Sequence, residues 1–313
     1  MPPPWTDPRW RAEAERWIHD HAEVVAEIEQ PHVRPWSTVM RVPTAAGDLW
    51  FKAVAPLHRF EPALTEFLAE LRPGSVPEVV ALDRDRAWML LRDGGTRLRE
   101  LPATVEHWAR ALPAYAELQI AAAPQAAELL ELGVPDFRLA KLRGLLQELL
   151  SEQPEGLISD EYRAMLDRLP EVESIADRLL AHGIPETIQH DDLHDGQVFV
   201  RDGSYLIFDW GDACVSHPFH TLTVTLRAAA WTLELEPGGP DLLRLRDAYL
   251  EPFGPPAELA TVADDAYRTG TLARALAWHR YVVARQAEDE EDAEAVAYGI
   301  KRFLEGGPIG TWE

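Results

Sequence analysis

The chain has 313 residues and a formal net charge of −23, from 53 acidic and 30 basic residues. This length exceeds one ordinary core and predicts two lobes, while a hydrophobic content of 46% excludes intrinsic disorder. The acidity argues against a nucleic-acid partner, which requires clustered Lys and Arg, and favours a neutral or cationic one. No apolar run reaches transmembrane length, no signal peptide is indicated and Cys214 is the only cysteine. We therefore expect no membrane partner and a cytoplasmic location.

The first part of the chain alternates between helical and β-type patterns. An amphipathic stripe that includes Trp10, Trp17 and Ile28 predicts a leading helix. Two β-type runs joined by the turn-rich PTAAGD predict a hairpin, and Pro62 opens the next helix. The expected elements are a helix over 8–29, strands over 36–42 and 49–54, a helix over 62–71, and strands over 78–82 and 87–91.

Helical periodicity dominates from residue 103 onward, and one hairpin near residue 200 is the only strand pair expected there. The expected helices cover 103–122, 138–152, 160–182, 218–234, 241–251, 257–286 and 289–304. RDGG at 92–95 breaks the chain. We expect an α+β chain with a nucleotide-binding lobe over 1–93, built on an antiparallel sheet, and a mainly helical lobe over 94–313 that carries the catalytic loop and the substrate site.

The segment from residue 190 to residue 212 carries the most specific motif. His190, Asp192 and Gln197 fall in the register H-x-D-L-x-x-x-N of kinase catalytic loops, with Gln in the place of Asn. A predicted hairpin leads to Asp209-Trp210-Gly211, where kinases carry Asp-Phe-Gly. Phosphoryl transfer needs a carboxylate that accepts a hydroxyl proton and oxygen ligands that hold magnesium on the phosphates. The segment can bring Asp192, Gln197 and Asp209 together for that reaction.

Lys52 is one of only three lysines, in a chain that otherwise uses Arg for positive charge. Its strand, LWFKAV, is similar to the kinase strand whose Lys holds the α- and β-phosphates and pairs with a helix Glu. At about 100° per residue, Glu61 lies at the edge of the apolar stripe of the following helix, whereas Glu66 faces solvent. Glu61 is therefore the predicted partner of Lys52.

The strand over 87–91 and the glycines after it predict a hinge for the adenine. The backbone carbonyl of Arg92 and the amide of Gly94 would bond to the base, although a structural left-handed turn is an equal alternative. The turn over 43–48 is interpreted as the place of the kinase glycine-rich loop. Gly47 is the only glycine there, so the G-x-G-x-x-G pattern is absent.

From Trp36 to about Thr223 the chain resembles the aminoglycoside phosphotransferase family, the small-molecule branch of the protein-kinase-like fold. The resemblance rests most specifically on QHDDLHDGQVFV and IFDWGDA, and also on Lys52, Glu61 and the WMLLRDGG hinge. It implies a bilobal fold and an ATP- and magnesium-dependent kinase. The γ-phosphoryl group would move to a hydroxyl of a small molecule such as an aminoglycoside, a sugar or an amino alcohol.

The resemblance also implies roles for individual residues. Asp192 would be the catalytic base, and Lys52 with Glu61 would orient the phosphates. Gln197 and Asp209 would bind magnesium. His190 would brace the catalytic loop through its ring nitrogens. The segment from Ser216 to Thr223 lacks two acidic positions that are common in the family, which leaves the acceptor open.

The same region leaves other interpretations open. His194 is expected to be structural, while Asp191, Asp195 and Asp212 either attract an ammonium-bearing acceptor or form a solvated loop. A metal-dependent hydrolase would hold zinc or manganese with His190, Asp192 and His194, but Asp209 and Lys52 would have no role in it. A catalytically silent kinase-like module that still binds nucleotide is a further alternative, suggested by Gln197 and the poor glycine loop.

Overall fold

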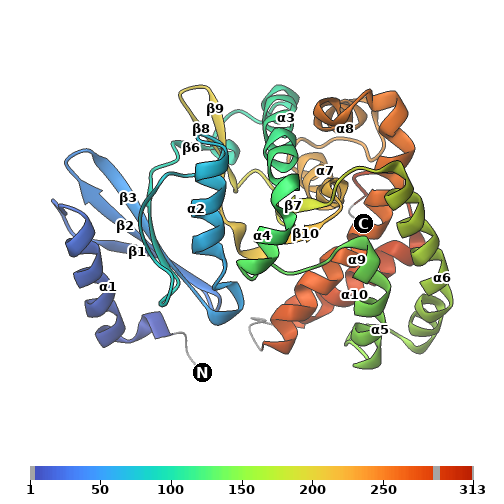
Figure 1. Cartoon of the computed structure of the whole chain (residues 1–313), viewed down its shortest axis with the longest axis horizontal. Coiled ribbons are helices and arrows are strands. Elements are labelled where there is room, and N and C mark those ends of the chain that lie inside the picture. The colour runs from blue at the N-terminus through green and yellow to red at the C-terminus, as the bar shows by residue number, and fades with distance from the viewer. Residues whose placement is uncertain (1–3, 285–289, 312–313) are drawn as a thin grey trace.

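The computed structural model describes residues 4–284 and 290–311, with the backbone alone for 290–293. A five-stranded antiparallel sheet with the order β1-β2-β3-β5-β4 lies at one end of the molecule (Figure 1). Its elements and the helices beside it are α1 (Pro8–His21), β1 (Glu29–Val33), β2 (Ser37–Thr44), β3 (Gly47–Val54), α2 (Glu61–Leu71), β4 (Val79–Asp83) and β5 (Trp88–Arg92).

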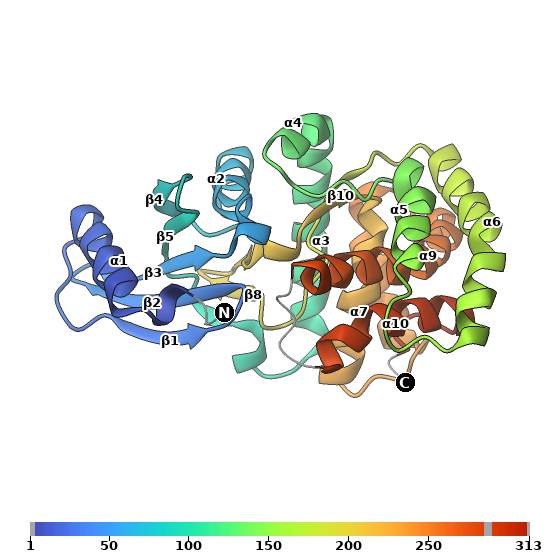
Figure 2. The ribbon, with the colours of Figure 1, turned by 90° about the horizontal axis from the view of Figure 1, so that it is seen from below.

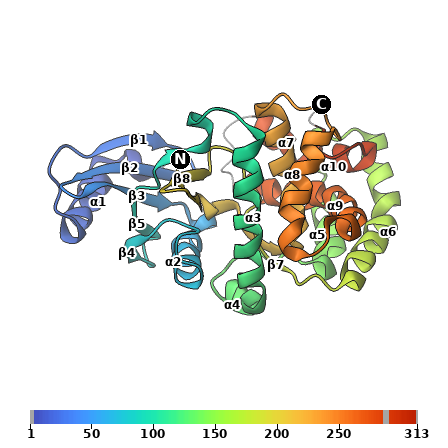
Figure 3. The same ribbon diagram turned by 90° about the horizontal axis from the view of Figure 1, so that it is seen from above.

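The two faces of this sheet are covered by different helices. Asp7 caps α1 by accepting a hydrogen bond from the Arg9 amide, and the helix packs Trp17 against Phe51 and Trp88 of the sheet. These aromatic rings belong to a small core that α1 shares with β2, β3 and β5. Helix α2 lies on the side of the sheet toward the helical part (Figures 1 and 3), and its Leu64 and Leu68 belong to the larger core there.

The remainder of the described chain is mainly helical and carries two small sheets, of which β8 lies beside the five-stranded sheet and β10 among the helices (Figure 2). Strand β6 pairs with β8, β8 with β9, and β7 with β10. The helices are α3 (Val105–Ala122), α4 (Ala126–Glu131), α5 (Leu139–Ser151), α6 (Ser159–His182), α7 (Leu222–Thr232), α8 (Pro240–Leu250), α9 (Pro256–Val283) and α10 (Glu290–Glu305). The strands are β6 (Thr96–Arg97), β7 (Thr187–Gln189), β8 (Val198–Arg201), β9 (Ser204–Ile207) and β10 (Cys214–Ser216).

The predicted fold class, a small antiparallel sheet followed by a large helical part, is confirmed. Several boundaries are wrong. The helix expected over 8–29 ends at His21, and β1 begins at residue 29. This strand was missed because its residues alternate between exposed and half-buried and carry no apolar face. The short strands β6, β7 and β10 and the helix α4 were also missed, and residues 285, 286 and 289 of the expected helices lie outside the described part of the chain.

The division into lobes over 1–93 and 94–313 stays a prediction. Helix α2 shares the large core with the helical part, so the core does not define a boundary between the lobes. No helix within the described residues combines the length and the apolar character needed to cross a membrane.

A 3-10 helix, Pro218–Thr221, precedes α7, and two buried histidines lie there, His217 directly before the helix and His220 within it. His217 caps this turn with its Nδ1, which accepts a hydrogen bond from the Phe219 amide at 3.2 Å. His220 Nε2 lies 3.1 Å from the Thr269 hydroxyl of α9. Burial alone lowers the pKa of His220 to about 3, because a charged imidazole there would lose its hydration. The folded protein therefore holds His220 neutral at pH values where an unfolded histidine is already protonated.

We expect His220→Gln to weaken the acid sensitivity of folding. A group whose folded pKa is depressed contributes stability above its unfolded pKa and loses that contribution as pH falls. Between pH 7.5 and 5.5, His220 should remove about 1.4 kcal/mol of unfolding free energy from the wild type. Denaturant titrations at both pH values would measure this, and the Gln variant should lose correspondingly less. An identical loss in the two proteins would contradict a buried neutral His220.

Candidate active site

Lys52 joins three separate elements at the inner face of the sheet. It lies in β3, opposite Val39 of β2 and Met89 of β5. Its Nζ lies 2.6 Å from Glu61 Oε1, at the start of α2, and 2.6 Å from Asp209 Oδ1, directly after β9. Glu66, the alternative that periodicity placed toward solvent, instead pairs with Arg84 at the surface. A single ammonium group thus ties the sheet to α2 and to the Asp-Trp-Gly segment.

Burial and charge act in opposite directions on this cluster. Glu61 is 1% exposed, and burial raises its pKa to about 7 although Lys52 opposes that shift. One oxygen of Glu61 accepts from Lys52 and from the Trp210 amide, whereas the other is buried without a partner in the described chain. Burial disfavours the charge of Lys52, and partial removal from solvent disfavours that of Asp209. Their mutual attraction outweighs both effects, so the pKa of Lys52 is raised and that of Asp209 is lowered. Both therefore stay charged at neutral pH.

His190 fastens the catalytic loop to the end of the hairpin. Its ring is fully buried, with Nε2 2.7 Å from the Phe208 carbonyl. A carbonyl only accepts, so Nε2 carries the proton and Nδ1 accepts the Asp192 amide at 3.2 Å. This neutral form agrees with burial, which lowers the pKa of His190. The arrangement is that of the brace expected from the motif.

Asp192 lies between a cation and a histidine. Arg274 of α9 donates from Nη2 to Asp192 Oδ1 at 3.1 Å, and His194 Nε2 lies 3.5 Å from Oδ2. Removal from solvent raises the pKa of Asp192, but Arg274 and the His194 hydrogen bond outweigh it, so the pKa is lowered. Asp192 is thus an ionised acceptor. His194 Nδ1 accepts from the Gly196 amide at 2.9 Å, which leaves Nε2 to carry the ring proton toward Asp192.

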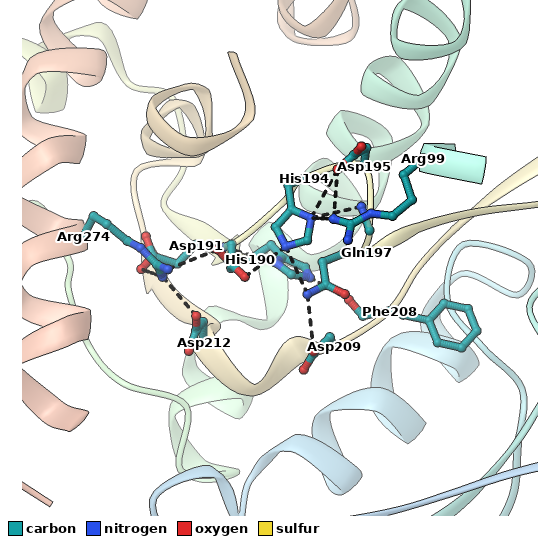
Figure 4. Close-up of polar contacts among 12 residues, drawn as sticks. Arg99, His190, Asp191, His194, Asp195, Gln197, Phe208, Asp209, Asp212 and Arg274 are labelled. Carbon is teal, nitrogen blue, oxygen red and sulfur yellow. Dashed lines mark hydrogen bonds and ion pairs between the residues drawn. The ribbon is translucent and has the colours of Figure 1, made fainter. Parts of the chain in front are cut away.

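Arg274 is the site residue that the sequence analysis missed. Its Nη1 donates to Asp191 at 3.1 Å and to Asp212 at 3.0 Å (Figure 4). These contacts add to the one between Nη2 and Asp192. Asp212 also accepts from the hydroxyl of Tyr281. The one signal in the sequence is an arginine within the apolar stretch TLARALAW, because a buried guanidinium needs carboxylate partners.

The three additional aspartates of the loop are therefore not a solvated cluster. Asp191 is 1% exposed and Asp212 is half-buried, and Arg274 pairs with both. Asp195 pairs with Arg99 at 3.0 Å. Each carboxylate already has a cation of the chain itself beside it.

Gln197 and Asp209 face one another across the site (Figure 4). The Gln197 amide nitrogen lies 3.3 Å from Asp209 Oδ2, while Oδ1 of the same carboxylate is held by Lys52. Half of the Asp209 side chain is exposed, so its second oxygen is accessible. Rotation of the Gln197 amide would bring its oxygen beside Asp209, and two oxygens of this kind suit a hard cation such as Mg²⁺. The two residues fit a magnesium site.

The hydrolase alternative is wrong. Both ring nitrogens of His190 are engaged by backbone groups, so neither is open to zinc or manganese. Across the described residues no cluster of three or more His, Cys, Asp or Glu side chains has the arrangement of a metal site. Lys52 and Asp209, which the hydrolase left without a role, are central to the observed cluster.

A cavity of about 610 Å³ extends from this cluster under the sheet. Gly94 lines it, and a Cβ there would lie 2.4 Å from the ring of Phe208, so only glycine fits. Arg92 is not among the lining residues. Its side chain pairs with Glu78 and its amide donates to the Glu78 carbonyl. The predicted contact of the Arg92 carbonyl with adenine stays a prediction.

The residues that line the same cavity show that the sequence analysis assigned the phosphate loop to the wrong turn. No residue of the turn over 43–48 lines the cavity, whereas Pro31 and His32 of β1 and Ser37 at the start of β2 do. These residues flank the turn over 34–36, between β1 and β2, and Trp36 of that turn lines the neighbouring smaller cavity beside Lys52 and Asp209. The error follows from the missed strand β1, which displaced the interpretation by one hairpin.

Comparison with known proteins agrees with this geometry. The model of the phosphotransferase enzyme family (APH) matches residues 28–261. Similar solved structures include a choline/ethanolamine kinase family protein from Mesorhizobium loti, with 18% identity, a TM-score of 0.65 and coverage of 96% of this chain and 95% of that one. Choline kinase LicA from Streptococcus pneumoniae has 13% identity, a TM-score of 0.64 and coverage of 95% and 98%.

The GDP and kanamycin complex of APH(2")-IIia is similar as well, with 15% identity, a TM-score of 0.63 and coverage of 96% and 98%. At these identities the solved structures establish the fold alone. No curated protein matches the sequence significantly. The family match spans most of the chain and includes the catalytic-loop and Asp-Trp-Gly motifs. The chain therefore belongs to the phosphotransferase enzyme family, as its motifs predict.

Proposed function

We propose that the protein is an ATP- and magnesium-dependent kinase that transfers the γ-phosphoryl group to a hydroxyl of a small molecule. The observation that carries this proposal is the position of Lys52, 2.6 Å from both Glu61 and Asp209 at the edge of a cavity large enough for a nucleotide. Kinases need such a Lys–Glu pair and the metal-binding Asp in place at the same time.

In the proposed reaction each residue of the site has a distinct role. Lys52 Nζ, already charged, would bind the α- and β-phosphate oxygens, and Glu61 would fix its direction. Asp192, ionised beside Arg274, would accept the hydroxyl proton of the acceptor as its oxygen attacks phosphorus. Gln197 and Asp209 would hold magnesium, which supplies positive charge against the phosphate oxygens.

Asp192→Asn should abolish turnover and leave nucleotide binding nearly intact, because a base acts on the acceptor and not on ATP. The loss should be on the order of 10²–10⁴-fold. Folding should persist, since Asp191 and Asp212 still pair with Arg274. ADP release and ATP-dependent thermal stabilisation would be compared with Asp202→Asn, an exposed turn aspartate of the neighbouring hairpin. Near-normal turnover in the Asp192 variant would refute its role as the base.

Glu61→Gln should impair catalysis at least tenfold, whereas Glu66→Gln should change it less than twofold. Only the first variant removes the carboxylate charge that accepts the hydrogen bond from Lys52, and a neutral amide oxygen is a weaker acceptor for an ammonium group. Burial already raises the pKa of Glu61 to about 7, so the neutral amide should be tolerated in folding. The informative result is thus a fall in kcat/KM without a comparable fall in Tm. Equal kinetic effects at the two positions would contradict the proposed pairing.

Gln197 separates an active kinase from a silent nucleotide-binding module. Gln197→Ala removes a proposed magnesium ligand and should reduce the rate severely, with incomplete rescue by added magnesium. Gln197→Asn keeps the amide but shortens its reach by one methylene, and Mg²⁺ tolerates poor geometry badly, so partial activity is expected. Rates measured across a magnesium series would test this. An unchanged rate in the Ala variant would exclude Gln197 as a ligand, and activity gained only in the Asn variant would favour the silent module.

A further inference from the structure

A second cavity, of about 470 Å³, lies between α7, α9, α10 and the segment after α10. Its lining is rich in cations although the chain carries 53 acidic and only 30 basic residues. The basic lining residues are Arg227, Arg268, Arg274, Lys301 and Arg302. Glu294 is the one acidic residue that lines it among those described. We refer to this space as the basic cavity.

Most of these cations have carboxylate partners that do not line the cavity. Arg268 pairs with Glu171 at 2.8 Å, and Arg302 pairs with Glu305 at 2.8 Å. Lys301 lies 3.7 Å from Glu161. These contacts hold the side chains in position without placing negative charge on the cavity wall.

Arg227 differs from its neighbours. Its guanidinium lies 5.5 Å from the ring centre of Tyr298, and no ion pair joins it to any residue that the structure describes. The side chain is half-buried, in α7. A partly desolvated cation without a counter-ion is unfavourable, and an anionic ligand would relieve that penalty.

The basic cavity adjoins the catalytic loop. Arg274 and Trp278 line both this cavity and a smaller one, of about 160 Å³, whose wall includes Asp192 and Asp209. The Arg274 guanidinium stacks 5.1 Å from the Trp278 ring centre and reaches Asp192 with Nη2. Its Nε is buried without an acceptor in the described chain. An oxyanion beside Arg274 would provide an acceptor of the kind that this group lacks.

We propose that the basic cavity binds an oxyanion, a phosphate or a carboxylate, carried by the phosphoryl acceptor itself. This inference rests on the proposed function and names its acceptor class, a small anionic hydroxyl compound. The planar guanidinium of Arg suits both oxyanions because it can donate two parallel hydrogen bonds. This anionic acceptor differs from the neutral or cationic partner that the net charge favours. The aspartates that would attract an ammonium group are already paired with Arg274.

The bond changes of the proposed reaction require only the acceptor, ATP and the Asp192 carboxylate. With its anionic end in the basic cavity, the acceptor presents its hydroxyl to Asp192. The hydroxyl proton passes to the Asp192 carboxylate while the acceptor oxygen forms a bond to the γ-phosphorus. The bond from that phosphorus to the bridging oxygen of ADP breaks. The products are ADP and the phosphorylated acceptor, and Asp192 returns its proton to solvent.

The first test measures oxyanion binding without any acceptor. Thermal unfolding would be followed with inorganic phosphate or malonate against sodium chloride of equal ionic strength. The wild type should be stabilised in a saturable manner by at least one of the two. Arg227→Gln should weaken the apparent affinity on the order of tenfold, as loss of a charge-assisted hydrogen bond implies. Arg227→Lys, which keeps the charge, should restore part of it.

Arg110→Gln is the matched control, because it removes the same charge from an exposed position of α3 that does not line the cavity. It should respond like the wild type. A response of Arg227→Gln equal to that of the wild type, or no saturable stabilisation by either probe, would overturn the inference. ATP-dependent stabilisation in each variant reports that the fold and the nucleotide site are intact.

The second test measures ADP release with sugar phosphates, hydroxy acids, neutral sugars, amino alcohols and aminoglycosides. Anionic acceptors should turn over, and Arg227→Gln should raise their KM about tenfold at unchanged KM for ATP. Turnover confined to neutral or cationic acceptors, unaffected by Arg227→Gln, would overturn the inference and leave the kinase function standing. If no acceptor in the panel supported ADP release although an oxyanion binds at Arg227, the proposed function and the acceptor role would both be overturned.

Discussion

The charge of Lys52 is the constraint on which the site depends. An ammonium group that is only 10% exposed is unfavourable unless carboxylates surround it, and Glu61 and Asp209 supply them from two distant parts of the chain. Because each partner belongs to a different element, satisfying this one charge fixes the sheet, α2 and the end of the catalytic hairpin relative to one another. The same contact leaves Asp209 Oδ2 beside Gln197. The proposed nucleotide and metal sides of the site would therefore share one electrostatic origin.

Arg274 plays the corresponding part beside Asp192, on the proposed acceptor side. It crosses from α9 to pair with three aspartates of the loop region, and His190 holds the same loop from the opposite direction through the Phe208 carbonyl. Lys52 and Arg274 together thus hold five carboxylates in a small volume. Without Arg274, Asp191 would remain buried and Asp212 half-buried with uncompensated charge, and burial already raises the pKa of Asp191 to about 7 despite the arginine. Ion pairs therefore hold this part of the molecule together with the apolar packing of the core around it.

The sequence was most informative where chemistry requires a short, ordered motif. The register of His190, Asp192, Gln197 and Asp209 was readable because all four directly flank one short hairpin. The helical period also separated Glu61 from Glu66 correctly. Strand β1 was not readable, since its polar residues carry no alternating apolar face, and the phosphate turn was misplaced with it. Arg274 was also out of reach, because it lies more than sixty residues beyond the motif and its partners are defined only by tertiary packing.

The local arrangement of charge explains how so acidic a chain can be suited to anionic ligands. At physiological ionic strength, charges that are exposed and farther apart than about 8 Å are largely screened from one another. Most of the net charge of −23 is therefore weakly felt inside a cavity, whereas the cations on its wall act at contact distance in a less polar medium. Both ATP and an anionic acceptor would meet such walls, one formed around Lys52 and the other around Arg227 and Arg274. Arg274 lies where the two negative reactants would approach each other, and its charge would offset their repulsion at the point where phosphoryl transfer occurs.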